Sequence, residues 1–227
     1  MVLQPDARPV VLAAPTGAGK TTIARRLVEG AGPFVFSVSA TTRAPRPGER
    51  DGEDYLFVDE ERFRGMVEQG ELAEWARVHG RLYGTPIRNL DDAAAGGRYP
   101  LLDIDVQGAR QIRDRVPNAL LVFVLPPSVD VWLDRLHGRG TEGVEERYRR
   151  LRSAAKELAD VEGFDVVLVN DDLEAAVQEV RRVILDGAPG LDDDDVRERV
   201  AALQDGVART LEELRIQLPE KGAVGNR

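Results

Sequence analysis

The stretch AAPTGAGKTT, Ala13 to Thr22, decides the fold class of this chain. Its second half matches the end of the Walker A pattern G-x-x-x-x-G-K-[ST], with Lys20 as the lysine and Thr21 as the hydroxyl residue. A short β-type run precedes it at Val10–Ala14, and a helix-type run follows at Thr21–Gly30. A strand before the motif and a helix after it are the context in which the motif forms a phosphate-binding loop.

The chemistry of this loop follows from its glycines and its lysine. Gly17 and Gly19 permit backbone conformations that turn several N–H groups inward around a phosphate, and the following helix adds its dipole. Lys20 would reach the β- and γ-phosphates, and the Thr21 hydroxyl would ligate Mg²⁺. Ala14 departs from the first glycine of the pattern, but a methyl group there is a small obstacle if the backbone keeps a negative φ. The predicted ATP-binding residues of the loop are Ala14, Pro15, Thr16, Gly17, Ala18, Gly19, Lys20 and Thr21.

Strand-type and helix-type runs alternate along the chain beyond the loop. This order predicts an α/β fold with a parallel sheet flanked by helices, and the fully apolar run Leu120–Leu125 is typical of a buried parallel strand. The further strands are expected at Phe34–Ser39, Tyr55–Val58, Leu101–Val106 and Val166–Val169. The further helices are expected at Asp59–Gln69, with Asp59 as the N-cap, and at Ala109–Arg115, Val129–His137, Glu145–Val161 and Leu173–Leu185.

Composition narrows the function classes. The 227 residues carry a net charge of -9, which argues against a nucleic-acid-binding surface, because phosphate backbones attract basic faces. There is no cysteine, and the two histidines, His79 and His137, do not have metal-ligand spacing. The longest apolar run, Ala119–Leu125, is far shorter than the ~20 residues that a membrane helix needs. We therefore expect a cytoplasmic protein with no membrane or nucleic-acid partner.

The sequence changes character after Asp186. A DGAPG linker leads into four aspartates and then into apolar residues at steps of three and four, which predicts one acidic amphipathic helix. We expect this helix to pack on its own domain; self-association into a homo-oligomer and a frayed tail are the alternatives. The apolar positions are Val196, Val200, Leu203, Val207, Leu211, Leu214 and Leu218.

Several longer motifs indicate which acceptor receives the phosphoryl group. FSVSATTRAPRPGERDGEDYLFV (36–58), ELAEWARVHGRLYGTP (71–86) and LLDIDVQG (101–108), with LPPS, HGRGTE and VNDDL, closely resemble guanylate kinase in the family's order. The resemblance runs from about Arg8 to Leu185. It implies a guanylate kinase-like domain over residues 8–188, with a core (8–37, 96–127 and 161–188), an inserted GMP-binding subdomain (38–95) and a mobile lid (128–160). Residues 189–227 form the C-terminal extension.

The resemblance also implies the residues that hold GMP. Ser39, Arg43, Arg46 and Tyr55 match the positions that bind the GMP phosphate, which two guanidinium forks and two hydroxyls can satisfy. Without the resemblance, the two arginines would read as solvated loop charge. Four further residues match the positions around the guanine, where carboxylates accept hydrogen bonds from its N1–H and 2-amino groups; they are Glu74, Tyr83, Thr85 and Asp105. Trp75, beside Glu74, is expected in the core, with stacking on the base as the alternative, and His79 is expected in a structural role.

The metal and the lid complete the expected site. Asp103 and Asp105 end an apolar strand as Walker B acids do, and we expect one of them, Asp103 in the first instance, to orient Mg²⁺ with Thr21; a capping role for Asp103 is the alternative. Asn170 and Asp171 match the family's contacts with the adenine of ATP, with an Asx turn as the alternative. Arg135, Arg139 and Arg150 match the arginines that close over the phosphates, and Arg135 and Arg139 are also expected to contact ATP. Arg149 is a neighbour that could substitute for Arg150. The alternative for Arg135 and Arg139 is an ordinary charged helix face.

The expected reaction is ATP + GMP to ADP + GDP with Mg²⁺, with dGMP as a second acceptor. Its catalytic groups would be cations that neutralise the transferring phosphoryl group, namely Lys20, Arg46, Arg135, Arg139 and Arg150. Two other hypotheses remain: a guanylate-kinase-like binding module without activity, and a kinase for another nucleoside monophosphate. The first would typically lose Lys20 or the arginines, and Glu74 and Asp105 argue against the second.

Overall fold

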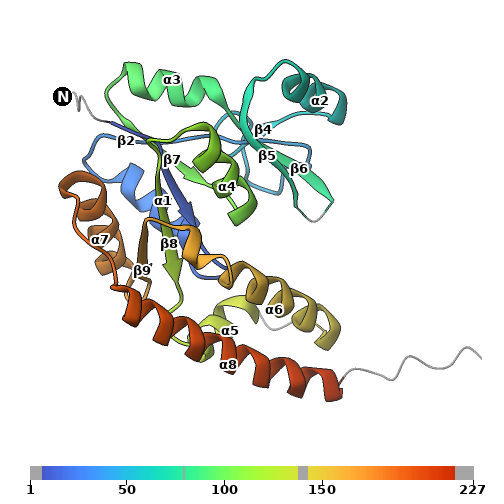
Figure 1. Cartoon of the computed structure of the whole chain (residues 1–227). Helices are drawn as coiled ribbons and strands as arrows, with labels where there is room; N and C mark the ends of the chain where they lie inside the picture. Colours follow the sequence, from blue (N-terminus) through green and yellow to red (C-terminus); the bar gives the residue numbers. More distant parts are fainter. Residues whose placement is uncertain (1–6, 79, 138–142, 218–227) are drawn as a thin grey trace, which may run out of the picture.

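A five-stranded parallel sheet forms the centre of the molecule (Figure 1). The computed structural model describes residues 7–78, 80–137 and 143–217. The strand order is β2 (Phe34–Phe36), β7 (Tyr99–Asp103), β1 (Val10–Ala13), β8 (Leu120–Leu125) and β9 (Val166–Val169). All four pairings are parallel. The predicted α/β class with a parallel sheet is therefore confirmed.

Both faces of this sheet are covered, which explains why its strands are apolar along their length, with Asp103 at the end of β7 as the charged exception. Val10 and Leu12 of β1 pack with helices α1 (Lys20–Glu29) and α7 (Leu173–Asp186). Val11 and Ala13, the alternate residues of the same strand, face the opposite cluster, which includes helix α4 (Val106–Arg115). Because successive strand residues point to opposite faces, a strand covered on both sides accommodates a polar residue only where it ends.

A second, four-stranded sheet lies beside the first and carries its own small core. Its order is β4 (Leu56–Phe57), β3 (Ala40–Thr41), β6 (Arg81–Pro86) and β5 (Leu72–Val78), with β5 and β6 forming an antiparallel hairpin. Phe63 and Met66 of helix α2 (Glu60–Glu68) pack on it. As predicted, Asp59 caps this helix by accepting a hydrogen bond of 2.7 Å from the Arg62 N–H. Helix α3 (Ile87–Ala95) then leads back to β7.

Three expectations about these elements were wrong. The strand expected over Phe34–Ser39 ends at Phe36, because the chain passes at Ser37–Ser39 from the first sheet to the second. The strand expected to reach Val106 ends at Asp103, because the Asp105 carboxylate caps α4 by accepting from the Gly108 N–H at 2.9 Å. Trp75 is 37% exposed rather than buried: β5 alternates, so its neighbours Glu74 and Ala76 point inward while Trp75 points out.

The C-terminal helix lies along the two helices of the predicted lid. Helix α8 (Asp193–Gln217) packs against α6 (Val144–Leu158) and α5 (Val129–His137), as Figure 1 shows along the lower edge of the molecule. Leu203, Val207 and Leu214 of α8 are buried there, and a short 3₁₀ turn, η1 (Val161–Gly163), returns the chain from α6 to β9. The predicted amphipathic helix and its packing within the chain are confirmed up to Gln217; Leu218 lies outside the described residues.

The aspartates at the start of α8 have a local cause. The Asp192 side chain accepts hydrogen bonds from the N–H groups of Asp194 and Asp195, at 3.1 and 2.8 Å, so it caps the helix.

Within the described ranges, no helix combines the length and the apolar character that crossing a bilayer demands.

Candidate active site

The predicted phosphate-binding loop joins β1 to α1, where the sequence places it. Gly17 and Gly19 adopt φ values of 90° and 95°, which favour glycine. Gly19 has a second constraint, since a Cβ there would lie 2.4 Å from the Asn170 side-chain nitrogen. The Ala18 N–H donates to the Pro15 carbonyl at 3.0 Å, which closes the turn of the loop, and Ala14 is buried against the first sheet. The structure therefore accommodates alanine at position 14, where the Walker A pattern has glycine.

Asp103 meets the loop at the end of the neighbouring strand. Its two carboxylate oxygens contact the Lys20 ammonium and, at 2.5 Å, the Thr21 hydroxyl. Burial alone would lower the pKa of Lys20, but the charge and hydrogen bond of Asp103 outweigh it and raise that pKa. Of the two candidate acids, Asp103 is thus the one at the loop, and the capping role belongs to Asp105.

A cleft of about 200 Å³ lies between the phosphate-binding loop and the second sheet. Asp103 and Asp105 meet it from the first sheet, and β5 and β6 meet it from the second. Tyr55 and Tyr83 contact each other edge to face, with ring centroids 6.0 Å apart. The polar residues that line the cleft were all predicted from the sequence; they are Lys20, Ser39, Tyr55, Glu74, Tyr83, Asp103 and Asp105.

Glu74 is the buried carboxylate of this cleft. Its residue is 3% exposed, and the Thr85 hydroxyl, itself fully buried, donates to it at 2.7 Å. Gly108 stands directly behind, where a Cβ would lie 2.6 Å from the second Glu74 oxygen. Burial raises the pKa of Glu74 to about 7; the hydrogen bond from the Thr85 hydroxyl lowers this pKa in part, and the charge of Asp105 adds a smaller upward contribution. Thr85 thus orients Glu74 and does not line the cleft.

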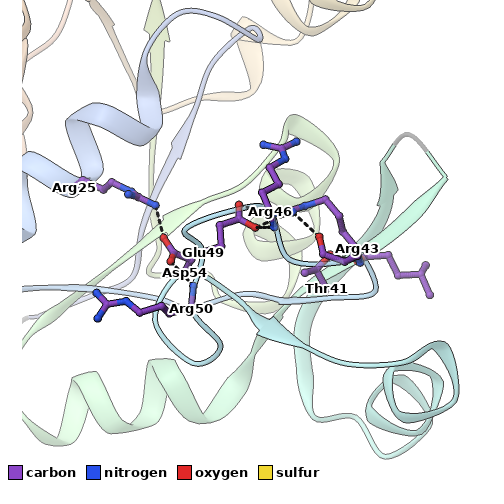
Figure 2. Close-up of polar contacts among 9 residues, drawn as sticks. Arg25, Thr41, Arg43, Arg46, Glu49, Arg50 and Asp54 are labelled. Carbon is purple, nitrogen blue, oxygen red and sulfur yellow. Dashed lines mark hydrogen bonds and ion pairs between the residues drawn. The ribbon is translucent and has the colours of Figure 1, made fainter.

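The two arginines predicted to bind the GMP phosphate, Arg43 and Arg46, lie on the loop between β3 and β4 (residues 42–55, the arginine loop; Figure 2). Arg43 makes a bidentate pair with Glu49, both bonds 2.8 Å, and its guanidinium lies 5.1 Å from the centroid of the Tyr55 ring. Hydrogen bonding to Arg43 lowers the pKa of Glu49 to about 2, with help from the Arg46 N–H. Figure 2 shows that the exposed Arg46 side chain extends away from this pair. The loop is also tied to the first sheet's layer, because Asp54 accepts from Arg25 of α1 at 2.8 Å.

The predicted lid residues are only partly gathered at the loop. Arg135 of α5 donates to the Asn170 carbonyl at 3.2 Å, whereas Arg150 is half-buried in α6. Arg149, the possible substitute, is exposed and pairs with Glu146 at 2.6 Å. Arg139 lies outside the described residues, as does His79.

Asn170 and Asp171 follow strand β9. The Asn170 amide donates to the Ala18 carbonyl at 2.8 Å, so its side chain supports the phosphate-binding loop rather than forming an Asx turn. It is 4% exposed, and its Oδ1 has no hydrogen-bond partner among the described residues. Asp171 is exposed, and the following Asp172 caps α7 by accepting from Ala175 at 2.9 Å.

Sequence reasoning missed four residues that shape the site. Glu49 holds Arg43, and Arg25 holds the arginine loop. Glu157 and Trp132, from the two predicted lid helices, contact Thr16 of the phosphate-binding loop. The contact between Arg43 and Glu49 could have been suggested from the sequence, because the two opposite charges are only six residues apart. The other contacts join residues 29, 116 and 141 positions apart, for which a single sequence carries no signal.

The donor chemistry of the site suits a hard cation. The Thr21 hydroxyl and the Asp103 carboxylate offer adjacent oxygens, which Mg²⁺ prefers. Within residues 7–78, 80–137 and 143–217, no cluster of three or more acidic, histidine or cysteine side chains could hold a metal by itself.

A phosphate-binding loop on a parallel sheet, faced by a second sheet that supplies a buried carboxylate and an arginine loop, defines a P-loop kinase that phosphorylates a small acceptor. Comparison with known proteins agrees. The family model described as Guanylate kinase matches residues 6–186. The chain belongs to the guanylate kinase family.

Individual relatives support this membership. A guanylate kinase of Nitratidesulfovibrio vulgaris is 50% identical over 177 residues, which cover 78% of this chain and 86% of the relative. One of Dechloromonas aromatica is 47% identical over 193 residues, covering 85% and 95%. The crystal structure of guanylate kinase from Anaplasma phagocytophilum is similar with a TM-score of 0.66 and 32% identity, covering 96% of this chain and 99% of that one.

Proposed function

We propose that this chain transfers the γ-phosphoryl group of ATP to GMP, giving ADP and GDP, and that dGMP is a second acceptor. Membership of the guanylate kinase family supports the activity. The observation that carries the choice of acceptor is Glu74, a carboxylate 3% exposed at the wall of a cleft whose other side is Lys20 and Asp103. An enzyme that transfers the phosphoryl group to water would not need a buried acid on the wall opposite the phosphate-binding loop.

Glu74 and Asp105 would recognise the guanine. Guanine presents two donors on one edge, N1–H and the 2-amino group, and ionised carboxylates accept from both. Adenine presents an acceptor at N1 and no 2-amino group, so it would leave a buried acceptor unpaired, which is costly. Thr85 fixes Glu74 from behind, and Tyr83 would close the side of the pocket beside Tyr55.

Ser39, Arg43, Arg46 and Tyr55 would hold the GMP phosphate. Ser39 and Tyr55 line the cleft, and Arg43 is held over the Tyr55 ring by Glu49. A guanidinium fork already fixed in place loses little freedom when a dianion arrives, which favours tight phosphate binding. Arg46 extends from the same loop and would meet the phosphate oxygen that attacks.

ATP would place its phosphates on the loop Ala14–Thr21, with Asn170 and Asp171 toward its adenine. The Oδ1 of Asn170, which has no hydrogen-bond partner in the described part of the chain, is a buried acceptor that suits an N–H donor. Asp103 and Thr21 would orient Mg²⁺, which neutralises phosphate charge when bound. Lys20, Arg46, Arg135, Arg139 and Arg150 would neutralise the charge that develops on the transferring group. No general base is needed, because the attacking phosphate oxygen is already anionic.

The subdivision expected from the sequence fits this mechanism. We propose residues 38–95 as the GMP-binding subdomain and 128–160 as the lid of a domain spanning 8–188, with 189–227 as an extension. Their approach would exclude water, so that ATP is not hydrolysed before GMP binds. Since α8 packs on the lid helices, its apolar stripe is used within the chain. Self-association through α8 and a cytoplasmic location stay predictions.

The test is an ADP-release assay with ATP and Mg²⁺ against GMP, dGMP, AMP, CMP and UMP, with a control that lacks any acceptor. ADP released only with GMP and dGMP is the expected result. Turnover with another acceptor would refute the role of Glu74 and Asp105. A folded protein without turnover would be a binding module.

A further inference from the structure

Thr16 of the phosphate-binding loop is held from both sides by the two helices α5 and α6. Its N–H donates to Oε2 of Glu157 at 2.8 Å, and its hydroxyl reaches the same carboxylate at 3.2 and 3.4 Å. Its carbonyl accepts from the indole N–H of Trp132 at 2.8 Å. Trp132 is fully buried in the first half of α5, and Glu157 is the second-to-last residue of α6.

These bonds fix two successive peptide planes of the loop. In a trans peptide the carbonyl and the following N–H point in opposite directions. The plane between Pro15 and Thr16 is therefore held at both ends, because Glu157 takes its N–H and the Ala18 N–H donates to its carbonyl at 3.0 Å. The plane between Thr16 and Gly17 is held through its carbonyl by Trp132, which turns the Gly17 N–H to the other side.

A loop of this kind needs such anchors. Gly17 and Gly19 have φ values near 90°, and glycine's backbone freedom makes rotation of the adjoining peptide planes inexpensive. If those planes rotated, N–H groups that should converge on a phosphate would point elsewhere. The Ala18–Pro15 bond spans Thr16 and the Asn170 bond holds Ala18, so neither of these anchors engages the N–H or the carbonyl of Thr16 itself.

We propose that Glu157 is a positioning residue for ATP: by holding the Thr16 N–H, it sets the direction of the loop amides that receive the phosphates. This rests on the proposed kinase function. Glu157 would act on ATP only through Thr16, without touching the substrate itself. Trp132 would have the same role on the following peptide plane.

The position of Glu157 is electrostatically unfavourable, which argues against a surface accident. Burial raises the pKa of Glu157, and the charge of Asp105 raises it as well, while the bonds from Thr16 and the charge of Lys20 lower it. A half-buried carboxylate kept in such a place is more often functional than one at the surface.

The experiment compares Glu157→Ala and Glu157→Gln with the parent protein, and Glu162→Ala serves as control, since Glu162 is exposed in the turn after α6. ADP and GMP binding are each measured by calorimetry with the other nucleotide absent. We expect Glu157→Ala to weaken ADP binding by about tenfold or more, the value of a hydrogen bond to a charged group, with GMP binding unchanged. Glu157→Gln should recover most of the loss, because its amide oxygen still accepts from Thr16.

Trp132→Phe gives an independent variant that keeps the ring in the core but removes the indole donor, and it should weaken ADP binding with GMP binding unchanged. Unaltered or tighter ADP binding in Glu157→Ala would overturn the proposal. Equal losses for ADP and GMP would also overturn it, because they would mark general damage to the fold. The binding readout does not depend on turnover, so a parent protein that bound nucleotides without phosphorylating GMP would refute the proposed function alone.

Discussion

Replacing Glu74 by glutamine should make the protein more stable and a poorer enzyme, and the gain in stability should depend on pH. The Glu74 carboxyl has a pKa of about 7 in the folded protein, against an ordinary value of 4.5. The folded state thus binds this proton more tightly than the unfolded state does. As the pH rises from about 4.5 to about 7, the unfolded state loses the proton first, so the free energy of unfolding falls over that window. Below 4.5 this effect is absent.

The size of the effect follows from the two pKa values. A rise of the pKa from 4.5 to about 7 corresponds to about 3 kcal/mol once the group is ionised in both states. At pH 5 the unfavourable contribution is about 1 kcal/mol, and at pH 8 it is about 3 kcal/mol. Because Glu74 is 3% exposed, solvent screening does not reduce this value. The stability difference between Glu74→Gln and the parent should therefore widen by about 2 kcal/mol from pH 5 to pH 8.

The assay is urea unfolding followed by tryptophan fluorescence, at pH 5 and pH 8, for the variant and the parent. Comparing differences between two pH values cancels any fixed cost of the glutamine amide. Glu68→Gln, an exposed position in α2, is the matched control and should show a constant difference from the parent. A constant difference for Glu74→Gln as well would refute the argument that burial of this carboxylate is costly.

The same variant tests the role of the carboxylate in binding. Glutamine keeps one acceptor for the Thr85 hydroxyl but removes the charge, so we expect kcat/KM for GMP to fall on the order of 10- to 100-fold, the value of one charge-assisted hydrogen bond. In the parent, GMP should bind more tightly as the pH rises from 6 to 8, because only the ionised carboxylate accepts both guanine donors. A GMP affinity that did not respond to pH, or a variant with parental kcat/KM, would contradict this role.

Three further predictions concern the phosphates and the C-terminal helix. Asp103→Asn should lower kcat on the order of 10²- to 10³-fold across a magnesium titration while leaving GMP affinity intact, and parental turnover would exclude Asp103 from the metal site. Arg43→Lys cannot reproduce the bidentate pair with Glu49, so GMP should bind about tenfold more weakly while guanosine, which lacks the phosphate, binds as before; an equal loss for guanosine would contradict a phosphate contact. Gly206→Ala places a methyl carbon 2.4 Å from Cγ2 of Val129 at the start of α5, so about 1–3 kcal/mol of overpacking should exceed the gain of about 1 kcal/mol in helix propensity and lower the melting temperature. A higher melting temperature would show that α8 does not pack closely on α5.

The features that the residues predicted without the family resemblance are those whose chemistry is local. The phosphate-binding loop, its two glycines and the cap at Asp59 follow from neighbours a few residues apart, and the structure has them where expected. The choice between Asp103 and Asp105 could not be made from the strand alone. It depends on Asp103 lying opposite Lys20 and Thr21, more than eighty residues earlier in the chain.

Trp75 shows why burial was harder to predict than element type. A tryptophan beside apolar residues suggests a core position, but the direction of each β5 side chain depends on which face of the second sheet meets the cleft. Since alternate residues point to opposite faces, placing Glu74 in the cleft forces Trp75 outward. Only the packing of the two sheets fixes that choice.

The sequence by itself determined the α/β class, the phosphate-binding loop and, through its motifs, the guanylate kinase family, because these depend on residue type and short spacing. The tertiary structure alone decided which acid meets Lys20, how Thr85 and Gly108 confine Glu74, and that Glu157 and Trp132 hold Thr16. These contacts join distant segments, and their existence depends on how strands register and helices pack. Local patterns cannot encode that geometry, because the same short sequence can meet different partners in different folds.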